Sequence, residues 1–382
     1  MDERVLSLIS AARFTFGSFF TARLRVCTAG EPNDTEVLIE VHASGLCHSD
    51  AHLTDGDLQV ELPFVGGHEG AGIVKKVGSK VTRVQVGDHV CTSFIPVCGV
   101  CKWCTTGRSN LCKNGYLMEQ GKSMDGTYRF SHDGKELGAL CRLGTFSDHI
   151  VCSEQQAIKI DDDIPLDVAC LVSCGVATGF GAATNVAEVK PGDVVLVVGM
   201  GGVGVNAVQG AAHAGATHVV VVDPVESKRE RAAEFGATAT FASIAEALPY
   251  IHERTEWQGT DATIITVDRA MGDIIAEAFR TVAKSGSCVL VALGPDTEVI
   301  PVHPQELQTM SRSIKGVMFG DCNPIADIPS LLAQYKAGKL KLDELVTTRY
   351  SLDDINQGFV DMKSGKNLRG VLVHDHAAVP AA

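Results

Sequence analysis

The feature of this 382-residue sequence that most constrains its fold is a glycine-rich segment at residues 199–204, GMGGVG. It follows the apolar run VVLVV and precedes the small-residue stretch VGVNAVQGAAHAG. In a G-x-G-x-x-G turn, Gly199 permits a tight bend, Gly201 lets a pyrophosphate approach the backbone, and Gly204 lets helix and strand pack closely. The helix start then offers free N–H groups and a positive dipole end to the diphosphate. The segment predicts a dinucleotide-binding unit; the alternative is a glycine turn in an α/β domain that binds no nucleotide.

The residues after this segment support the dinucleotide prediction. Asp223 ends the next apolar run, THVVVVD. A carboxylate there can bind both ribose hydroxyls and repel a 2′-phosphate, which favours NAD over NADP. The other interpretation is a solvated acid in the turn at the strand end. Candidate strands and helices continue to alternate, which predicts a parallel sheet with helices on both faces.

The first part of the chain has a different pattern. Between residues 36 and 151 the runs VLIEV, GIVKKV, GDHVCTS and FSDHIVC are separated by Gly, Pro and Asp, and no long helical pattern interrupts them. After residue 320 come two helix-like segments and a last strand, GVLVHD. The predicted fold class is α/β, with a β-rich domain and a doubly wound parallel-sheet domain.

Charge and hydropathy limit the partners. Lys and Arg number 33 against 46 Asp and Glu, a net charge of −13. An acidic surface repels phosphate backbones, so no nucleic-acid partner is expected. Residues 194–222 carry no charge, but their glycines and β-branched opening predict a buried strand, turn and helix, not a membrane span. The acidic N-terminus and Arg13 do not fit a secretory signal, so we expect a cytoplasmic protein with no membrane partner.

The 13 cysteines point to metal thiolates in a reducing compartment, because their number is odd and several are clustered. Four of them form the pattern C-x2-C-x2-C-x7-C: Cys98, Cys101, Cys104 and Cys112. Four thiolates without histidine are typical of a closed structural zinc site. An iron–sulfur cluster uses similar spacing, and unpaired buried cysteines are a further alternative. The site is expected to hold together an exposed loop that lacks its own core.

A second group of possible ligands cannot be assembled from spacing. Cys47 lies in GLCHSD, His68 in GGHEG and Cys174 in LVSCGVATG, far apart along the chain. Taken alone, such a histidine is more often a hydrogen-bonded structural residue, and such a cysteine a small buried apolar residue.

Seven segments between residues 36 and 373 together resemble the zinc-dependent medium-chain alcohol dehydrogenases: GLCHSD, GHEGAGIV, GDHV, CGVCKWC, SCGVATGFGA, GMGGVG and LRGVLV. The resemblance implies a GroES-like, zinc-binding catalytic domain over residues 1–178 and 320–382 and a Rossmann NAD-binding domain over 179–319. It also implies two zinc ions per chain. Cys47, His68 and Cys174 match the catalytic zinc ligands, and the four clustered cysteines match the structural zinc.

The resemblance assigns further roles near the catalytic zinc. The metal lowers the pKa of an alcohol and so favours hydride transfer to NAD, which leaves an aldehyde or ketone. Ser49 and His52 match a relay that carries the proton to water. Asp50 resembles the carboxylate that orients His68. Glu69 resembles a residue that modulates the metal from behind. Without the family, such residues can equally be plain polar residues of loops.

Cofactor and substrate contacts are also implied by the resemblance. Phe94 matches a wall of the substrate pocket, although an aromatic residue there can simply pack. Lys228 could instead be an exposed helix charge, and Arg369 a surface ion pair. The cofactor-binding positions are His48, Thr178, Gly199, Gly201, Gly202, Val203, Gly204, Asp223, Lys228 and Arg369.

Other segments resemble one subgroup in particular. LMEQGKSMDGTYRF, DPVESKRERAAEFGAT and LLAQYKAGKLKLDELVT are similar to the actinobacterial nicotinoprotein alcohol dehydrogenases, in which bound NAD(H) is recycled by an external electron acceptor. The opening RFTFGSFFTARLRVCTAG departs from the family's usual start, which leaves the pocket shape open there. The partners implied are a small alcohol or aldehyde and further copies of the chain, in a dimer or tetramer formed through edge strands near SIKGVMFG.

Two alternative functions stay open. A glutathione- or mycothiol-dependent formaldehyde dehydrogenase is less favoured, because KNGY follows the fourth lobe cysteine where that subgroup places an arginine. A non-catalytic zinc- and NAD-binding protein is disfavoured, because every catalytic ligand and both relay residues are present.

Overall fold

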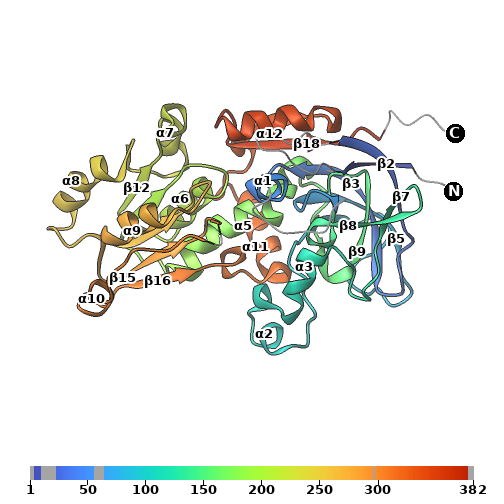
Figure 1. Ribbon diagram of the computed structural model, residues 1–382, viewed down its shortest axis with the longest axis horizontal. Helices are drawn as coiled ribbons and strands as arrows, with labels where there is room; N and C mark the ends of the chain where they lie inside the picture. Colours follow the sequence, from blue (N-terminus) through green and yellow to red (C-terminus); the bar gives the residue numbers. More distant parts are fainter. Residues whose placement is uncertain (1–3, 10–22, 56–63, 296, 377–382) are drawn as a thin grey trace. The chain divides into compact units, whose positions relative to one another are not determined.

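The computed structural model describes residues 4–9, 23–55, 64–295 and 297–376, and the described chain divides into two compact units (Figure 1). Unit 1 holds the described residues up to Cys174, then Asn323–Gly338 and the described residues from Leu342 onward. Unit 2 holds Gly175–Cys322, apart from residue 296, and Lys339–Lys341. The α/β fold class predicted from the sequence is confirmed.

Unit 1 is rich in β-strands, as the alternating runs predict (Figure 1). Five strands form a closed barrel in the order β1 (Arg4–Ile9), β2 (Arg23–Ala29), β7 (Phe130–His132), β8 (Lys135–Ala139) and β4 (Phe64–Val65). A second sheet runs in the order β10 (Ala157–Lys159), β6 (His89–Thr92), β5 (Gly70–Val77), β3 (Glu36–Gly45), β18 (Arg369–Val373) and β17 (Val346–Tyr350). β9 (His149–Ser153) also pairs with β3.

Strand β3 organises this second sheet. Val37, Ile39 and Val41 alternate along it and are fully buried on one face, as the two-residue period of a strand requires. β5 pairs with β3 over most of its length. β9 pairs with residues 36–40 of β3, and β18 pairs with residues 43–45. The C-terminal strand therefore lies beside the end of β3, close to the segment that carries Cys47.

Short helices interrupt the β-rich part, although the sequence pattern showed no long helical segment there. They are α1 (His48–Asp55), α2 (Lys102–Thr105) and α3 (Leu117–Gln120). One or two turns are too short for helical periodicity to show in the sequence. The other helices of unit 1 are α4 (Leu166–Ala169), α11 (Pro324–Lys336) and α12 (Ile355–Lys363).

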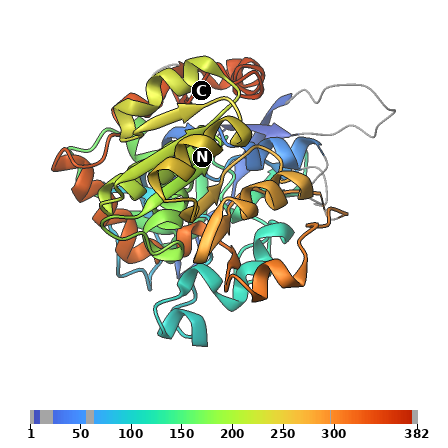
Figure 2. The same cartoon turned by 90° about the vertical axis from the view of Figure 1, so that its left-hand side faces the viewer.

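Unit 2 contains a six-stranded sheet in which every neighbouring pair is parallel. Its order is β13 (Ala239–Phe241), β12 (His218–Val222), β11 (Val194–Val198), β14 (Thr260–Ile265), β15 (Val282–Leu290) and β16 (Ser313–Gly316). Helices flank the sheet, as Figures 1 and 2 show. They include α5 (Gly175–Gly181), α6 (Gly204–His213), α7 (Glu226–Ala232), α8 (Ile244–Arg254), α9 (Gly272–Arg280) and α10 (Pro304–Gln308). The parallel sheet predicted from the alternating pattern is confirmed.

The strand order places the glycine-rich segment at a switch point. From β11 the chain continues to β12 and β13 on one side, and later strands β14, β15 and β16 lie on the other side. Ligands of open parallel sheets bind at the carboxyl ends of the strands where the order reverses. The loop after β11, which holds the GMGGVG segment, occupies that position.

The uncharged stretch 194–222 forms β11, α6 and β12. Within the described residues no single helix is long and apolar enough to cross a membrane. Leu166–Ser173 and Gly175–Val186, bent by 52°, meet the criterion only as a pair, by length and composition.

Candidate metal centres and dinucleotide site

The first candidate metal centre joins three distant parts of unit 1. Cys47 lies between β3 and α1, His68 and Glu69 lie between β4 and β5, and Cys174 follows the helical turn after α4. One ligand atom from each of these four residues lies within 4.8 Å of the others. The structure thus brings together the three candidate ligands that sequence spacing could not connect, with Glu69 beside them.

The orientation of His68 fits a metal ligand. Its side chain is buried, and Nδ1 lies 3.3 Å from Oδ1 of Asp50. The Gly67 N–H donates to the same oxygen at 3.0 Å. A carboxylate at Nδ1 favours the tautomer that leaves a lone pair on Nε2. Nε2 is buried and has no hydrogen-bond partner among the described residues, so it can coordinate an ion at the centre of the cluster.

The charges around the cluster favour a cation. A hydrogen bond with the Cys174 thiol lowers the pKa of Cys47 well below the usual range, and His68 lowers it further, although burial opposes this. Burial opposes protonation of His68, but Asp50 and then Cys47 raise the pKa of His68 well above its usual range. The raised pKa reflects the negative charge of Asp50 and Cys47 around this ring, and the same charge would attract a metal cation in place of the proton. Two sulfurs, one imidazole nitrogen and a nearby carboxylate form the donor set of a zinc site that keeps an open position.

A buried ion pair lies next to the cluster. Glu69 is fully buried and pairs with Nη2 of Arg369, whose side chain is only 4% exposed. The same Nη2 donates to the Leu46 carbonyl oxygen at 3.3 Å. Burial raises the pKa of Glu69 to about 7, although Arg369 pulls it down. This pairing was missed in the sequence because 300 residues separate the partners. The predicted pyrophosphate contact of Arg369 stays a prediction.

The predicted relay residues lie on α1, next to Cys47. The Cys47 thiol donates to Oγ of Ser49 at 3.6 Å. His52 follows three residues later, and residues three apart lie on the same helix face. His48, the first residue of α1, is half-buried. Phe94, also half-buried, lies edge-on to the His68 ring, with ring centroids 5.9 Å apart.

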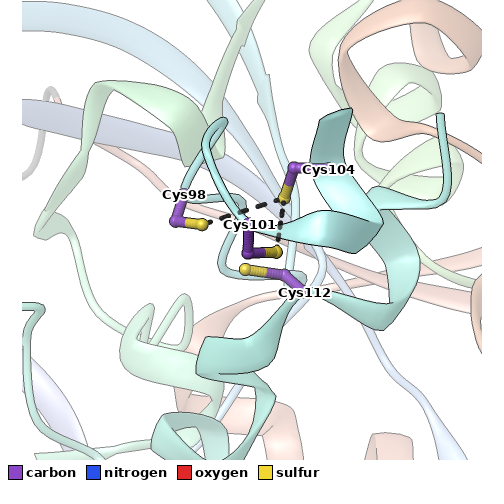
Figure 3. A group of neighbouring side chains, drawn as sticks. All are labelled: Cys98, Cys101, Cys104 and Cys112. Atoms are coloured by element: carbon purple, nitrogen blue, oxygen red, sulfur yellow. Dashed lines mark hydrogen bonds between the residues drawn. The ribbon is translucent and has the colours of Figure 1, made fainter. Parts of the chain in front are cut away.

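The second candidate metal centre is the four-cysteine lobe shown in Figure 3, where the sulfurs of Cys98, Cys101, Cys104 and Cys112 converge. The Cys104 sulfur lies 3.9 Å from that of Cys98 and 3.6 Å from that of Cys101. Backbone N–H groups of Cys104 and then Lys113 donate to the Cys101 sulfur and lower the pKa of its thiol to about 6. Such N–H donors stabilise the thiolate of Cys101, whereas burial raises the pKa of Cys104 and raises that of Cys112 to about 12. Four converging sulfurs are the ligand set of a closed zinc site.

The glycine segment of unit 2 fits a dinucleotide phosphate. Gly199 has φ +99°, a conformation that favours glycine. A Cβ at Gly204 would collide with the Gly199 carbonyl oxygen, so the start of α6 needs glycine there. A Cβ at Gly201 would meet no atom within 4 Å, so that side of the loop is open to a ligand. Each glycine therefore has the geometry expected of its place in the motif.

The acidic residue predicted to bind ribose lies beside this loop. The carboxylate of Asp223 accepts hydrogen bonds from the Met200 N–H at 2.7 Å and the Val225 N–H at 2.8 Å. It thereby ties the loop to the end of β12, and a carboxylate keeps further lone pairs for ribose hydroxyls. Lys228, on α7, is half-buried.

The remaining predicted cofactor contacts lie where α5 and the glycine loop approach each other. A Cβ at Gly179 would collide with the Val203 carbonyl oxygen, which shows how closely α5 packs on the loop. Thr178, Gly202 and Val203 lie at this approach and are half-buried.

Known proteins match both units. The family model for the alcohol dehydrogenase GroES-like domain matches residues 33–162, and the model for zinc-binding dehydrogenases matches residues 202–337. The NDMA-dependent alcohol dehydrogenase of Amycolatopsis methanolica is 48% identical over 344 residues, covering 90% of this chain and 93% of that protein. Alcohol dehydrogenase B of Mycobacterium tuberculosis is 46% identical over 347 residues, covering 90% and 92%.

A solved structure agrees with these matches. The benzyl alcohol dehydrogenase of Acinetobacter calcoaceticus superposes with a TM-score of 0.89 at 28% identity, over 98% of this chain and all of that one.

Proposed function

This chain belongs to the zinc-dependent medium-chain alcohol dehydrogenases, and we propose that it oxidises small alcohols to aldehydes or ketones with NAD as the hydride acceptor. The observation that carries the proposal is the convergence of Cys47, His68 and Cys174 within 4.8 Å. The unpartnered Nε2 of His68 supports a catalytic ion at that point, because a buried imidazole nitrogen otherwise lacks a partner.

The chemistry follows from these ligands. A zinc ion held by Cys47, His68 and Cys174 would supply Lewis acidity to the hydroxyl of an alcohol. Asp50 holds the His68 ring in the ligating tautomer, and Glu69 with Arg369 places a buried ion pair behind it. Ser49 takes the hydroxyl proton and His52 passes it towards water, while the carbinol carbon gives up its hydride and a C=O bond forms.

Unit 2 supplies the cofactor contacts in this proposal. Gly199, Gly201 and Gly204 present the start of α6 to the pyrophosphate of NAD. The Asp223 carboxylate favours the free 2′-hydroxyl of NAD over the 2′-phosphate of NADP. His48, Thr178, Val203, Lys228 and Arg369 are proposed as further contacts. Two zinc ions per chain are proposed, the second in the four-cysteine lobe.

Removal of one catalytic ligand tests the mechanism. Cys47→Ala should abolish NAD-linked alcohol oxidation and lower the zinc content from two ions per chain to one. The matched control is Cys152→Ala, which truncates a buried cysteine of unit 1 outside both metal clusters and should keep both ions and the activity. Full activity of Cys47→Ala would rule out the proposed mechanism.

The alternative function has its own test. Oxidation of formaldehyde is measured with and without glutathione or mycothiol, and activity that requires the thiol would identify a thiol-dependent dehydrogenase.

We also propose that the chain retains NAD(H) and passes its electrons to an external acceptor. The Amycolatopsis relative supports this proposal, because its name, NDMA-dependent alcohol dehydrogenase, refers to an external electron acceptor. Denaturing the purified protein should release about one nicotinamide nucleotide per chain into the supernatant, whereas a cofactor-free supernatant would contradict retention. We further propose a cytoplasmic location, because both candidate metal centres contain clustered cysteines and a reducing compartment keeps thiols available for zinc.

A further inference from the structure

A third group of potential metal ligands lies on unit 1, outside the two centres described above. It consists of Glu40, His42 and His376, and one ligand atom of each lies within 4.8 Å of the others. The proposed alcohol oxidation uses none of these residues. All three side chains are partly exposed, so an ion from solvent can reach them.

The pairing of strands explains why these residues meet. Glu40 and His42 are two positions apart on β3 and therefore share one face of the strand. β9 begins at His149, which pairs directly with Glu40. The chain after β18 continues along the same edge of β3, where the His374 N–H donates to the His42 carbonyl oxygen at 3.0 Å. This continuation brings His376 to the same point.

The Glu40 carboxylate lies at the centre of the group. Its Oε1 lies 3.0 Å from Nε2 of His42 and 3.0 Å from Nζ of Lys75. Its Oε2 lies 3.9 Å from Nε2 of His149. The rings of His42 and His376 lie side by side, with centroids 4.7 Å apart and planes tilted by 49°. A carboxylate surrounded by imidazoles offers mixed oxygen and nitrogen donors within reach of one ion.

The contact of His376 with the backbone orients it as a ligand. Its Nε2 lies 2.8 Å from the Val41 carbonyl oxygen, which can only accept a hydrogen bond, so Nε2 carries the hydrogen. The lone pair is then on Nδ1. Donation of one ring N–H to a backbone carbonyl is the usual way in which proteins fix the tautomer of a metal-ligating histidine.

We propose that Glu40, His42 and His376 bind a borderline divalent cation such as Zn2+ or Ni2+, with His149 positioned beside them. Two imidazoles and one carboxylate suit these ions better than Mg2+ or Ca2+, which prefer oxygen ligands. The ion replaces Lys75 as the positive partner of Glu40. Lys75 is 42% exposed and can turn into solvent, but its competition makes this site weaker than the two cysteine-containing centres.

Binding at this site also ties the end of the chain to β3, because His376 follows β18 and Glu40 and His42 belong to β3. A ligand that binds only the folded state raises its stability by mass action. Added zinc should therefore raise the melting temperature of the protein in a concentration-dependent way through these residues.

Zinc titration of the full-length, untagged protein tests the proposal. The resident zinc is first counted by plasma mass spectrometry, and Zn2+ is then added in equilibrium dialysis. The wild type should take up one further equivalent per chain and show a raised melting temperature. His42→Gln with His376→Gln should lose both effects and keep the resident zinc. Lys75→Gln should lower the dissociation constant of the added ion, because the competing ammonium group is gone.

The matched control is His132→Gln, a partly exposed histidine of β7 in unit 1 that also lies 3.3 Å from a carboxylate, that of Asp133. This variant should take up the added zinc as the wild type does. Unchanged uptake by the double variant, no added equivalent in the wild type, or unchanged affinity in Lys75→Gln would each overturn the proposal. Because the resident zinc is counted separately, these outcomes are independent of the proposed alcohol oxidation.

Discussion

Single atoms decide the properties of both candidate sites. In unit 1 one oxygen of Asp50 contacts both the His68 ring and the Gly67 N–H, so ring orientation and loop conformation depend on the same group. In unit 2 the absence of Cβ atoms at the glycines decides how closely α6 packs and where a ligand can approach the loop. Gly201 and Gly204 are three residues apart, yet a Cβ at Gly204 would collide with the backbone and a Cβ at Gly201 would meet no atom within 4 Å.

This contrast gives a prediction for two variants of the same type. Gly204→Ala places a Cβ against the Gly199 carbonyl oxygen and should lower the free energy of unfolding by about 1–3 kcal/mol, the usual cost of overpacking. Gly201→Ala meets no atom within 4 Å and should leave stability nearly unchanged but weaken NAD binding, because the methyl group occupies the ligand side of the loop. Denaturant unfolding and NAD titration measure the two effects. Equal losses of stability in the two variants would contradict the assigned roles.

At the scale of elements, the four-cysteine lobe differs from the rest of unit 1. Its helix α2 has four residues, including Cys104, and none of them is buried. A helix this short is not stable by itself in water. We therefore expect the lobe to depend on the proposed zinc ion in place of an apolar core.

Removal of the proposed lobe zinc should disorder α2. The fluorescence emission of Trp103, which lies in this helix, measures that change. The chain has only two tryptophans, Trp103 in α2 and Trp257. In a Trp257→Phe background, a chelator or the additional change Cys104→Ser should shift Trp103 emission to that of a fully solvated indole. Trp103 also stacks with the charged groups of Lys102 and Arg108, at 5.1 and 5.6 Å from the ring centre, and these contacts should be lost together. An unchanged emission spectrum after zinc release would show that the lobe folds without its metal.

At the scale of the whole molecule, unit 1 is assembled from both parts of the chain. Its sheet needs β17 and β18, which follow unit 2 in the sequence, and the ion pair of Glu69 needs Arg369 from β18. Among the strands that the structure describes, β16 lies at the edge of the unit 2 sheet and pairs with β15 alone. An unpaired strand edge is a template for pairing with another chain.

The edge position of β16 supports the homo-oligomer expected from the sequence. We predict that the protein sediments as a dimer or tetramer, with backbone amides of residues 313–316 protected from hydrogen exchange. Identical edge strands can pair about a two-fold axis, which closes the assembly. Sedimentation as a monomer together with rapid exchange in this strand would contradict an interface at β16.

The sequence was informative wherever a few consecutive residues determine the structure. The GMGGVG turn, the parallel strands around it and the four-cysteine spacing all lie within short segments. Helices of about two turns or fewer were not predicted from the sequence, as the eight-residue helix α1 shows. The candidate catalytic ligands were named only through the family resemblance, because no local pattern links Cys47 with Cys174.

Short sequence segments specify local chemistry: a strand, turn and helix suited to a diphosphate, a lobe of four cysteines suited to a metal, and an excess of acidic residues. Which distant groups meet becomes visible in the folded chain alone. The antiparallel pairing of β18 with β3 brings Arg369 to Glu69 and His376 to Glu40 and His42. The physical reason is that hydrophobic periodicity selects the face of a strand that is buried, whereas the neighbour of that strand depends on packing across the whole chain.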